Sequence, residues 1–237
     1  MSDWTAKRFW KEATVGEVSG GYGVLLDGRP VRTPAKAPLI VPTREMAAAI
    51  AAEWDAQEGK IDPLSMPVTR GANAAIDKVS AQHAEVVTML ADYGDADLIC
   101  YRATFPEELI ARQAAAWDPL ILWAKTDLGA ALVPIQGVIH RPQDPDALRC
   151  LHDQVAKLDA FALAAFHDLV SLSGSLIIGF AVLHNSKTAE ELWSLSRIDE
   201  AWQQEQWGED DEALETAAIK KSAFLQAKVF LTLLGIT

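Results

Sequence analysis

The stretch that decides the fold lies near the start of the chain and reads Tyr22-Gly23-Val24-Leu25-Leu26-Asp27-Gly28-Arg29-Pro30-Val31-Arg32-Thr33. Residues 22–26 have the apolar and aromatic character of a β-strand. Asp27 and Gly28 tolerate the positive φ angles that a tight hairpin turn requires. Because residues 31–33 read as strand again after this turn, the stretch predicts an antiparallel hairpin.

Two more short strands flank this hairpin in the sequence. Residues 12–15 precede it, with Ser19-Gly20-Gly21 as the turn between, and residues 39–41 follow it. Prolines recur at every fourth position, at Pro30, Pro34, Pro38 and Pro42. Proline cannot donate to a strand ladder, so these segments are confined to short or edge strands. The N-terminal part is therefore expected to form a small antiparallel sheet.

One helix is expected to cover a face of that sheet. Thr43 is a good N-cap, and Met46, Ile50 and Trp54 follow at steps of four, which places them on one apolar stripe. Gly59 is the expected end of this helix. The interpretation of Trp54 is structural, holding the helix to the sheet. Residues 61–67 contain two prolines and read as a linker, which predicts a β-rich domain over 1–64.

Residues 65–237 read as an all-α helical domain. The patterns predict a continuous helix over about 72–90, a helix over 107–117, two buried helices within 158–183, and a last helix from about 210 to 234. Asp118-Pro119 marks either a kink or a fresh helix start, and Asp144-Pro145 a start. Thr188-Ala189-Glu190-Glu191 reads as a capping box that opens an acidic and aromatic helix. The fold class is α+β: a small N-terminal antiparallel β domain with one covering helix, then a mostly α-helical domain.

Composition excludes several classes of function. The chain has 237 residues, of which 50% are hydrophobic and 23% are charged, so a packed core is expected rather than disorder. Its net charge of -12 argues against a nucleic-acid partner and against an anionic membrane surface. The most apolar run, residues 176–183, is far shorter than the roughly 20 residues that span a bilayer. Cys100 and Cys150 lack any motif and read as reduced thiols.

Motifs for catalysis or cofactor binding are missing from the sequence. The five histidines show no metal-ligand spacing. Residues 174–179 resemble the front of a phosphate loop, but Phe180-Ala181 stands where lysine and a hydroxyl residue belong. The expectation is a protein with no catalytic residues, no metal and no cofactor. The alternative kept open is a small acidic enzyme that uses the carboxylates of Asp92, Asp95 and Asp97 for acid–base work.

The densest chemical signal lies in a C-terminal acidic and aromatic run. Between residues 185 and 217 ten acids face two bases, Lys187 and Arg197. Indoles bury large apolar areas, and clustered carboxylates gain from a cationic partner, so this run suits gripping a protein surface. The candidate partner-binding residues are Asp199, Glu200, Trp202, Trp207, Glu209 and Asp210. The alternative for Trp202 is a core side chain of the helical domain.

The chain resembles a known family through motifs that occur in order along nearly its whole length. They are Lys7-Arg8-Phe9-Trp10-Lys11, the hairpin of residues 22–34, Ala52-Glu53-Trp54-Asp55-Ala56-Gln57, Met66-Pro67-Val68-Thr69, Ala75-Ile76-Asp77, the block 97–103, Gln113 with residues 117–120, Asp199-Glu200-Ala201-Trp202-Gln203, and Trp207-Gly208-Glu209-Asp210. Together they resemble the assembly chaperones of F1 ATP synthase that bind the F1 alpha subunit.

This resemblance implies a β-rich N-terminal domain joined to a helical domain, no catalysis and no nucleotide. It implies transient binding of the unassembled F1 alpha subunit, which keeps that subunit from aggregating before it meets F1 beta. Within the matching block, Glu200 is the acid expected to contact the partner, with Trp202 and Trp207 as anchors and Glu209 and Asp210 as rim. A bacterial cytoplasmic member is expected, or a processed form from the mitochondrial matrix, since the sequence opens without a targeting pattern. Tyr101 and Arg102 are left as structural or functional, and a buried Arg102 would need a carboxylate such as Asp97.

Overall fold

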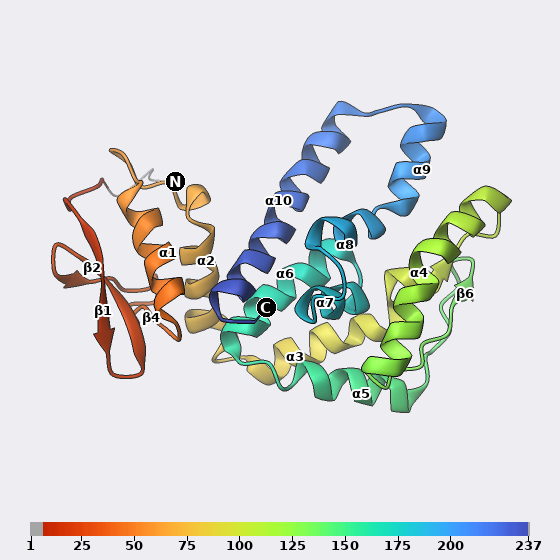
Figure 1. The fold of residues 1–237 in the computed structure, drawn as a ribbon, viewed down its shortest axis with the longest axis horizontal. Coiled ribbons are helices and arrows are strands. Elements are labelled where there is room, and N and C mark those ends of the chain that lie inside the picture. Colours follow the sequence, from red (N-terminus) through yellow and green to blue (C-terminus); the bar gives the residue numbers. More distant parts are fainter. Residues whose placement is uncertain (1–6, 237) are drawn as a thin grey trace. The chain divides into compact units, whose positions relative to one another are not determined.

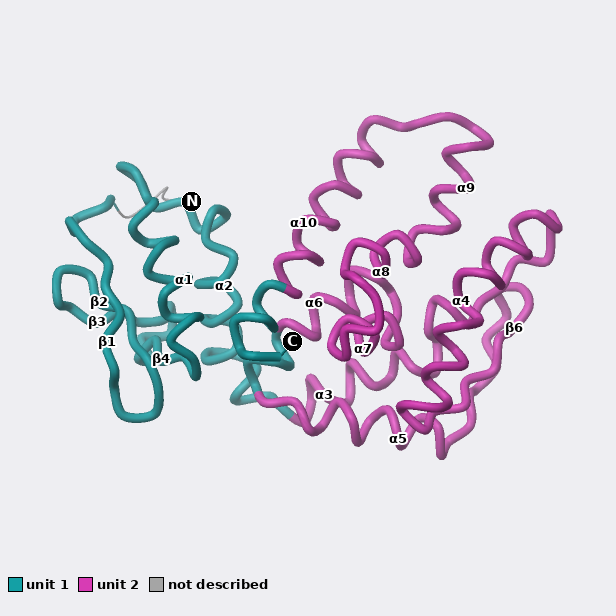
Figure 2. Tube along the Cα trace, in the orientation of Figure 1, with its two compact units in different colours: residues 1–83, 160–164, 229–236 teal, residues 84–159, 165–228, 237 magenta. Residues whose placement is uncertain are grey.

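A computed structural model describes residues 7–236 of the chain. Within this range the chain divides into two units (Figure 2). Unit 1 contains residues 7–83, 160–164 and 229–236, and unit 2 contains residues 84–159 and 165–228. The N-terminal sheet lies in unit 1, and most of the helices lie in unit 2, so the predicted α+β class is confirmed.

The sheet of unit 1 is built around the predicted hairpin. β1 (Ala13–Val18) pairs antiparallel with β2 (Gly21–Leu26), with Val15 opposite Val24. β2 then turns through Asp27 and Gly28, whose φ angles of 46° and 79° are both positive. The strand after this turn is β3 (Arg29–Pro30), earlier than the predicted 31–33, and β4 (Ile40–Val41) also pairs with β2. β2 is thus the central strand, as its nearly continuous burial requires.

Helix α1 (Arg44–Asp55) covers this sheet as expected (Figure 1). Its N-cap is Thr43, whose side chain accepts a hydrogen bond from the Met46 amide. Met46 and Ile50 are 0% exposed, and the half-buried Trp54 ring meets the ring of Trp10 edge to face at 5.2 Å. The helix ends at Asp55 rather than at Gly59, because the buried Gln57 side chain redirects the chain by accepting a hydrogen bond from the Asp62 amide.

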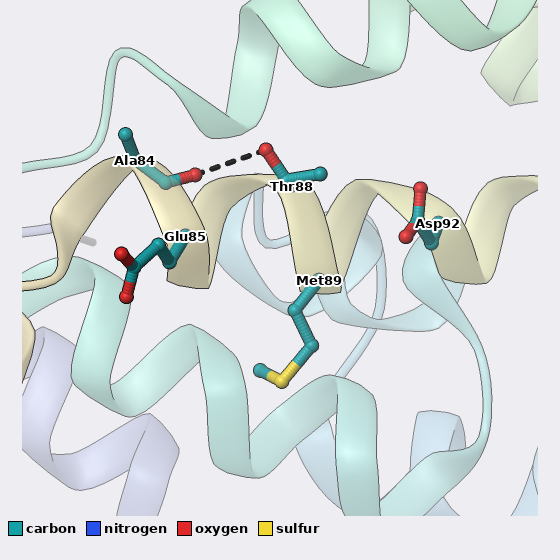
Figure 3. Close-up of a pocket in the computed structure, with 5 residues that line it drawn as sticks. All are labelled: Ala84, Glu85, Thr88, Met89 and Asp92. Atoms are coloured by element: carbon teal, nitrogen blue, oxygen red, sulfur yellow. Dashed lines mark hydrogen bonds between the residues drawn. The ribbon is translucent and has the colours of Figure 1, made fainter.

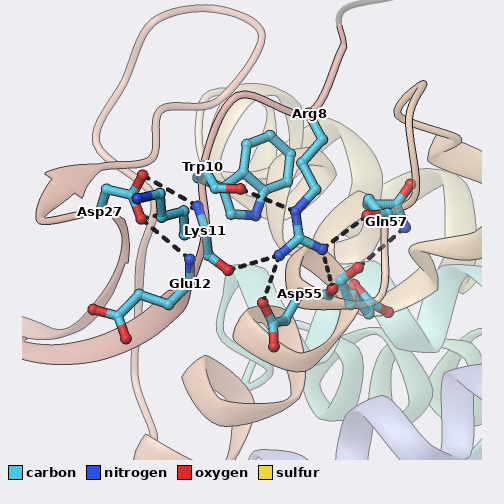
Figure 4. Close-up of polar contacts among 8 residues, drawn as sticks. Arg8, Trp10, Lys11, Glu12, Asp27, Asp55 and Gln57 are labelled. Atoms are coloured by element: carbon cyan, nitrogen blue, oxygen red, sulfur yellow. Dashed lines mark hydrogen bonds and ion pairs between the residues drawn. The ribbon is translucent and has the colours of Figure 1, made fainter.

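Arg8 ties the N-terminal segment to the end of α1 (Figure 4). Its guanidinium donates to the carbonyl oxygens of Gln57 at 2.9 Å and Lys11 at 2.8 Å, and it pairs with the Asp55 carboxylate at 3.0 Å. The turn residue Asp27 accepts hydrogen bonds from the Lys11 and Glu12 amides, and these bonds hold the pKa of its carboxyl below the ordinary value. These contacts therefore hold the N-terminal segment both to the end of α1 and to the turn after β2.

The segment expected to be a linker is ordered in short helices. η1 (Pro63–Ser65) is followed at once by α2 (Pro67–Ala74) and by the π-helical turn η2 (Ala75–Val79). Gly71 on α2 allows a very close approach, because a Cβ there would lie 2.6 Å from the Phe230 ring. The Thr43 hydroxyl also donates to the Leu233 carbonyl. Residues near the C-terminus thus complete unit 1, and the division into domains over 1–64 and 65–237 stays a prediction.

The predicted continuous helix over 72–90 is wrong. The chain leaves helical geometry after η2 and begins again as α3 (His83–Ala91). Ser80 accounts for the break, since both its amide and its hydroxyl donate to the Ala75 carbonyl, which widens the turn to π geometry. A hydroxyl that competes for a backbone acceptor leaves no mark on the apolar periodicity.

The remaining helices and strands belong mainly to unit 2, and two of the helices extend into unit 1. They are η3 (Asp92–Ala96), η4 (Leu98–Cys100), β5 (Tyr101–Arg102), α4 (Glu107–Asp127), β6 (Ile135–Gln136), α5 (Pro145–Val155), α6 (Ala160–Ser173), α7 (Leu176–Leu183), α8 (Ala189–Leu195), α9 (Ile198–Trp207) and α10 (Asp211–Leu233). β5 and β6 form a short parallel pair within the helical region. Among the described residues, none of these helices is both long enough and apolar enough to cross a membrane.

Helix boundaries in this region follow the capping residues. Asp144 caps α5 as predicted, and α4 continues through Pro119 rather than starting afresh there. The apolar stretch forms the two expected helices, α6 and α7, which separate at Gly174 and the N-cap Ser175. Gly179 allows the two helices to pack closely because it has no side chain. A Cβ at this position would lie 2.8 Å from a methyl carbon of Val170.

The predicted capping box at Thr188 is present, but the helix that it opens is α8. α8 ends at Leu195, where the buried Ser196 hydroxyl donates to the Trp193 carbonyl. The acidic and aromatic residues lie in the next helix, α9. The expectation that the capping box opens the acidic helix is therefore wrong. The break between α8 and α9 lies at Ser196, and no glycine or proline marks it in the sequence.

Candidate functional site

Helix α9 carries most of the candidate partner-binding residues. It packs against α4 within unit 2, and none of its residues is fully buried. It ends at Gly208, whose φ of 92° favours glycine, so Trp207 stands on the last turn. The Trp207 side chain is 80% exposed. An indole that faces solvent to this extent is available to a partner.

Trp202 lies on α9 but is held by α4. The ring is half-buried, and the Arg112 guanidinium carbon lies 5.3 Å from its centroid. Arg112 also makes two hydrogen bonds to the Glu205 carboxylate, at 2.8 and 2.9 Å, and these bonds keep the pKa of Glu205 below its usual range. Sequence reasoning left Glu205 out of the site, although its position three residues after Trp202 places both on one helix face.

Asp199 is a structural contact more than a free acid. Its Oδ1 accepts a hydrogen bond from the Gln113 amide at 2.6 Å, and the Gln113 Oε1 accepts one from the Ala103 backbone at 2.8 Å. Gln113 is 2% exposed. The pair therefore connects α9 through α4 to the end of β5. Nearby, the buried Trp117 indole donates to the Leu195 carbonyl at 2.7 Å, which fixes α8 to the same helix.

Glu200 faces solvent on the first turn of α9. It forms an ion pair with Arg197, and the Arg197 guanidinium lies 5.4 Å from the centroid of the buried Trp193 ring. Burial lowers the pKa of Arg197. Glu200 is thus oriented by its neighbour but remains open to a cationic partner.

The last two candidate residues divide between surface and cap. Glu209 is exposed. Asp210 is also exposed, and its carboxylate accepts hydrogen bonds from the amides of Glu212 and Ala213 at 3.0 and 3.3 Å. Asp210 therefore caps α10, and its place at the rim of a partner interface stays a prediction. The six candidates fall on one continuous stretch, with Trp207, Glu200 and Glu209 the most available.

Arg102 pairs with a different acid from the one expected. Its Nη1 lies 2.8 Å from the Asp118 carboxylate, its Nε donates to the Ile99 carbonyl at 2.9 Å, and its guanidinium stacks over Trp117. The buried Arg102 therefore has the carboxylate that it was expected to need, and this carboxylate is Asp118 rather than the example given, Asp97. Asp97 instead caps η4 by accepting a hydrogen bond from the Ile99 amide, and it accepts a second one from the Ile177 amide in the first turn of α7.

The three carboxylates of the alternative enzyme have different surroundings in unit 2. Asp92 lies on an open, shallow surface beside Met89 on α3 (Figure 3). Asp95 accepts a hydrogen bond from the Gln143 amide at 2.7 Å and faces His140 at 3.2 Å. Asp97 is 0% exposed, and burial raises the pKa of its carboxyl to about 6. Over residues 7–236 no group of three or more potential metal ligands is found.

Comparison with known proteins decides the family. The profile of the family described as "ATP12 chaperone protein" matches residues 7–125. The chain belongs to the ATP12 chaperone family. The resemblance to ATP synthase assembly chaperones, drawn from the ordered motifs, is thereby confirmed.

Relatives of known structure cover the whole fold of this ATP12 family member. Crystal structures of Atp12 from Paracoccus denitrificans and of an aspartate-to-lysine mutant of it share 50% identity with this chain at a TM-score of 0.95, over 98% of this chain and 99% of theirs. A candidate chaperone from Agrobacterium tumefaciens shares 43% identity at a TM-score of 0.92, over 96% of this chain and 86% of its own. The mitochondrial protein atp12 of Schizosaccharomyces pombe is 28% identical over 88% of this chain and 76% of its own.

Proposed function

We propose that this ATP12 family member binds the unassembled F1 alpha subunit of ATP synthase and keeps it from aggregating before it assembles with F1 beta. Family membership supports an assembly chaperone. The single observation that supports a polypeptide client at α9 is Trp207, an indole left 80% exposed beside a run of carboxylates. Exposed apolar surface on a chain that belongs to a chaperone family suits a second apolar surface.

The mechanism follows from the division of labour on α9. Trp207, together with the exposed face of Trp202, supplies apolar contact area, as aromatic anchors do in many interfaces. Glu200 and Glu209 supply charge at the rim, which sets orientation and the association rate more than the affinity. An interface of roughly 1,200–2,000 Å² in total is standard for a specific complex. Such an interface can be displaced by a larger one, so F1 beta would release the client by mass action.

The proposal needs no reaction and no bound group. Asp199, Trp202 and Asp210 already make contacts that order α9 and the start of α10. The site is therefore preformed, and binding does not need to order it first. We place the protein in the bacterial cytoplasm, or in the mitochondrial matrix if it is a processed eukaryotic form, because its relatives include one bacterial protein and one that is described as mitochondrial.

Light scattering of the F1 alpha subunit tests the proposal. Purified alpha subunit that is prone to unfold is warmed with an equimolar amount of this protein, and scattering is followed with time. The expected result is suppressed aggregation. Trp207→Ala should suppress less well, whereas Val138→Ala, which trims a side chain that is 91% exposed elsewhere on unit 2, serves as the matched control. Unchanged aggregation with the unaltered protein would refute the proposed function.

A cross-linking map then tests the position of the client. Cross-links from residues 199–210 to the alpha subunit are expected to dominate. Cross-links confined to unit 1 would show that α9 is not the contact surface, even if aggregation is suppressed.

A further inference from the structure

A shallow groove lies between α4 and α8, both within unit 2. Ala115, Ala116 and Pro119 line it from α4. Glu190, Glu191, Ser194 and Leu195 line it from α8, and Lys187 lines it from just before that helix. Its walls are fixed relative to each other, because the Trp117 indole donates to the Leu195 carbonyl. The α4 side of the groove is apolar, and polar groups line the α8 side.

Pro119 leaves an acceptor on the α4 side of this groove. In an α-helix the amide at position 119 would donate to the carbonyl four residues earlier, that of Ala115. Proline has no N–H, so the Ala115 carbonyl lacks its helical donor. Ala115 and Pro119 are both exposed and both line the groove. A hydrogen-bond donor from outside the helix could therefore reach this carbonyl.

The charges on the α8 side leave one carboxylate unpaired. Glu191 accepts hydrogen bonds from the amide and hydroxyl of Thr188, each 2.9 Å long, and these bonds, helped by the nearby Lys187, hold its pKa below the ordinary value. The Glu190 carboxylate, by contrast, forms no hydrogen bond or ion pair with any residue in the range 7–236. Lys187 and Glu191, which both line the groove, carry opposite formal charges, so the groove keeps one net negative charge from Glu190.

These features fit one kind of side chain. Lysine and arginine have apolar stems and cationic heads that only donate hydrogen bonds. We propose that the groove receives a lysine or arginine side chain of the client polypeptide, with the stem on Pro119 and Leu195 and the head near the Glu190 carboxylate and the Ala115 carbonyl. The inference rests on the proposed function, because it takes the partner to be a polypeptide. The groove and the α9 surface share α4, so one client can reach both.

Pro119→Ala gives the sharpest test, because stability and binding should move in opposite directions. The alanine amide restores the donor to the Ala115 carbonyl, which should raise the melting temperature. The same change removes the acceptor and the ring that hold the client side chain, so the F1 alpha subunit should bind about fivefold more weakly. Glu190→Gln should weaken binding about tenfold, and Glu85→Gln, an exposed acid on α3, should leave it unchanged. Unchanged affinity in both groove variants overturns the inference while leaving the proposed function intact.

A second probe separates the groove from the identity of the client. The full-length protein is titrated with the capped peptide acetyl-Leu-Lys-Leu-amide and with the same peptide carrying acetyl-lysine, and amide shifts are followed by NMR. Shifts at Ala115, Ser194 and Leu195 are expected with the first peptide and not with the second. If these shifts occur but the alpha subunit does not bind, the proposed client is wrong and the groove inference stands. Equal shifts with both peptides, or shifts that accompany self-association in sedimentation, overturn it.

Discussion

Two pairs of tryptophans show how the same side chain takes different roles in the two units. In unit 1, Trp10 is 3% exposed and its ring meets that of Trp54 at 5.2 Å. In unit 2, Trp202 is half-buried under Arg112 and Trp207 is 80% exposed. Trp54 continues the buried stripe of α1, whereas Trp207 ends a helix without a fully buried residue. Position on the helix, and not residue type, decides whether the indole is packed or exposed.

The largest expected effect is the loss of a buried indole. Trp10→Ala should lower the free energy of unfolding by about 3–5 kcal/mol, because it removes a fully packed ring and leaves a cavity against Trp54. Urea unfolding followed by circular dichroism measures this. Trp207→Ala is the matched control and should change the free energy of unfolding by less than about 0.5 kcal/mol. Equal losses in the two variants would end the distinction between the pairs.

Buried and exposed carboxylates should also differ in their effect on stability. Burial raises the pKa of Asp97 from 3.8 to about 6 in the folded protein. The folded state therefore binds this proton more tightly than the unfolded state does, and the stability that protonation supplies is lost as the pH rises from about 4 to about 6. The change in unfolding free energy is on the order of 2 kcal/mol across this window.

Asp97→Asn should flatten that pH dependence, because an amide does not titrate there. The slope of the unfolding free energy against pH, obtained from urea melts between pH 4 and 7, is the readout. Glu200→Gln alters an exposed acid and should leave the slope as it is. A slope that persists in Asp97→Asn would assign the titration to another group.

The exposed indole should matter for binding instead of stability. Trp207→Ala is expected to weaken binding of the F1 alpha subunit about tenfold while the melting temperature stays constant. Isothermal titration calorimetry and thermal melts measure the two quantities. The same truncation at Val138 should change neither, and a similar loss there would indicate a diffuse apolar contact.

Reversal of a rim charge has the smallest expected effect. Glu200→Lys should weaken binding about threefold and leave the protein folded, because Glu200 is exposed and its ion pair is with Arg197, the residue just before its own helix. The loss should shrink when the salt concentration is raised, since exposed charges are screened. A large fall in the melting temperature would make Glu200 a structural residue.

Local signals were the part of the fold that the sequence predicted well. The turn at Asp27 and Gly28, the Thr43 cap and the Thr188 capping box each depend on residues within a few positions of one another. Short-range hydrogen bonds of this kind can be predicted from the residue types alone. The ordered family motifs also predicted the fold class, which the structure confirms.

The misses arise where a side chain acts on a partner that is distant or unmarked. The hydroxyls of Ser80 and Ser196 donate to backbone carbonyls where helical runs end. Serine is also common within helices, so its presence alone does not predict such an end. A buried Arg102 was expected to need a carboxylate, but the sequence could not show that this is Asp118, because the pairing depends on β5 and α4 meeting in space. For the same reason the contact between Arg112 and Glu205, which orders the candidate site, could not be seen in advance.

The return of the C-terminal segment to unit 1 has a consequence for biosynthesis. Leu233 lies 190 positions after Thr43, to which it is hydrogen-bonded, and Phe230 lies against Gly71. A ribosome delivers the hairpin and α1 long before it delivers these residues. The part of unit 1 that is synthesised first therefore leaves the surface around Gly71 without its Phe230 contact until residues 229–236 have been made.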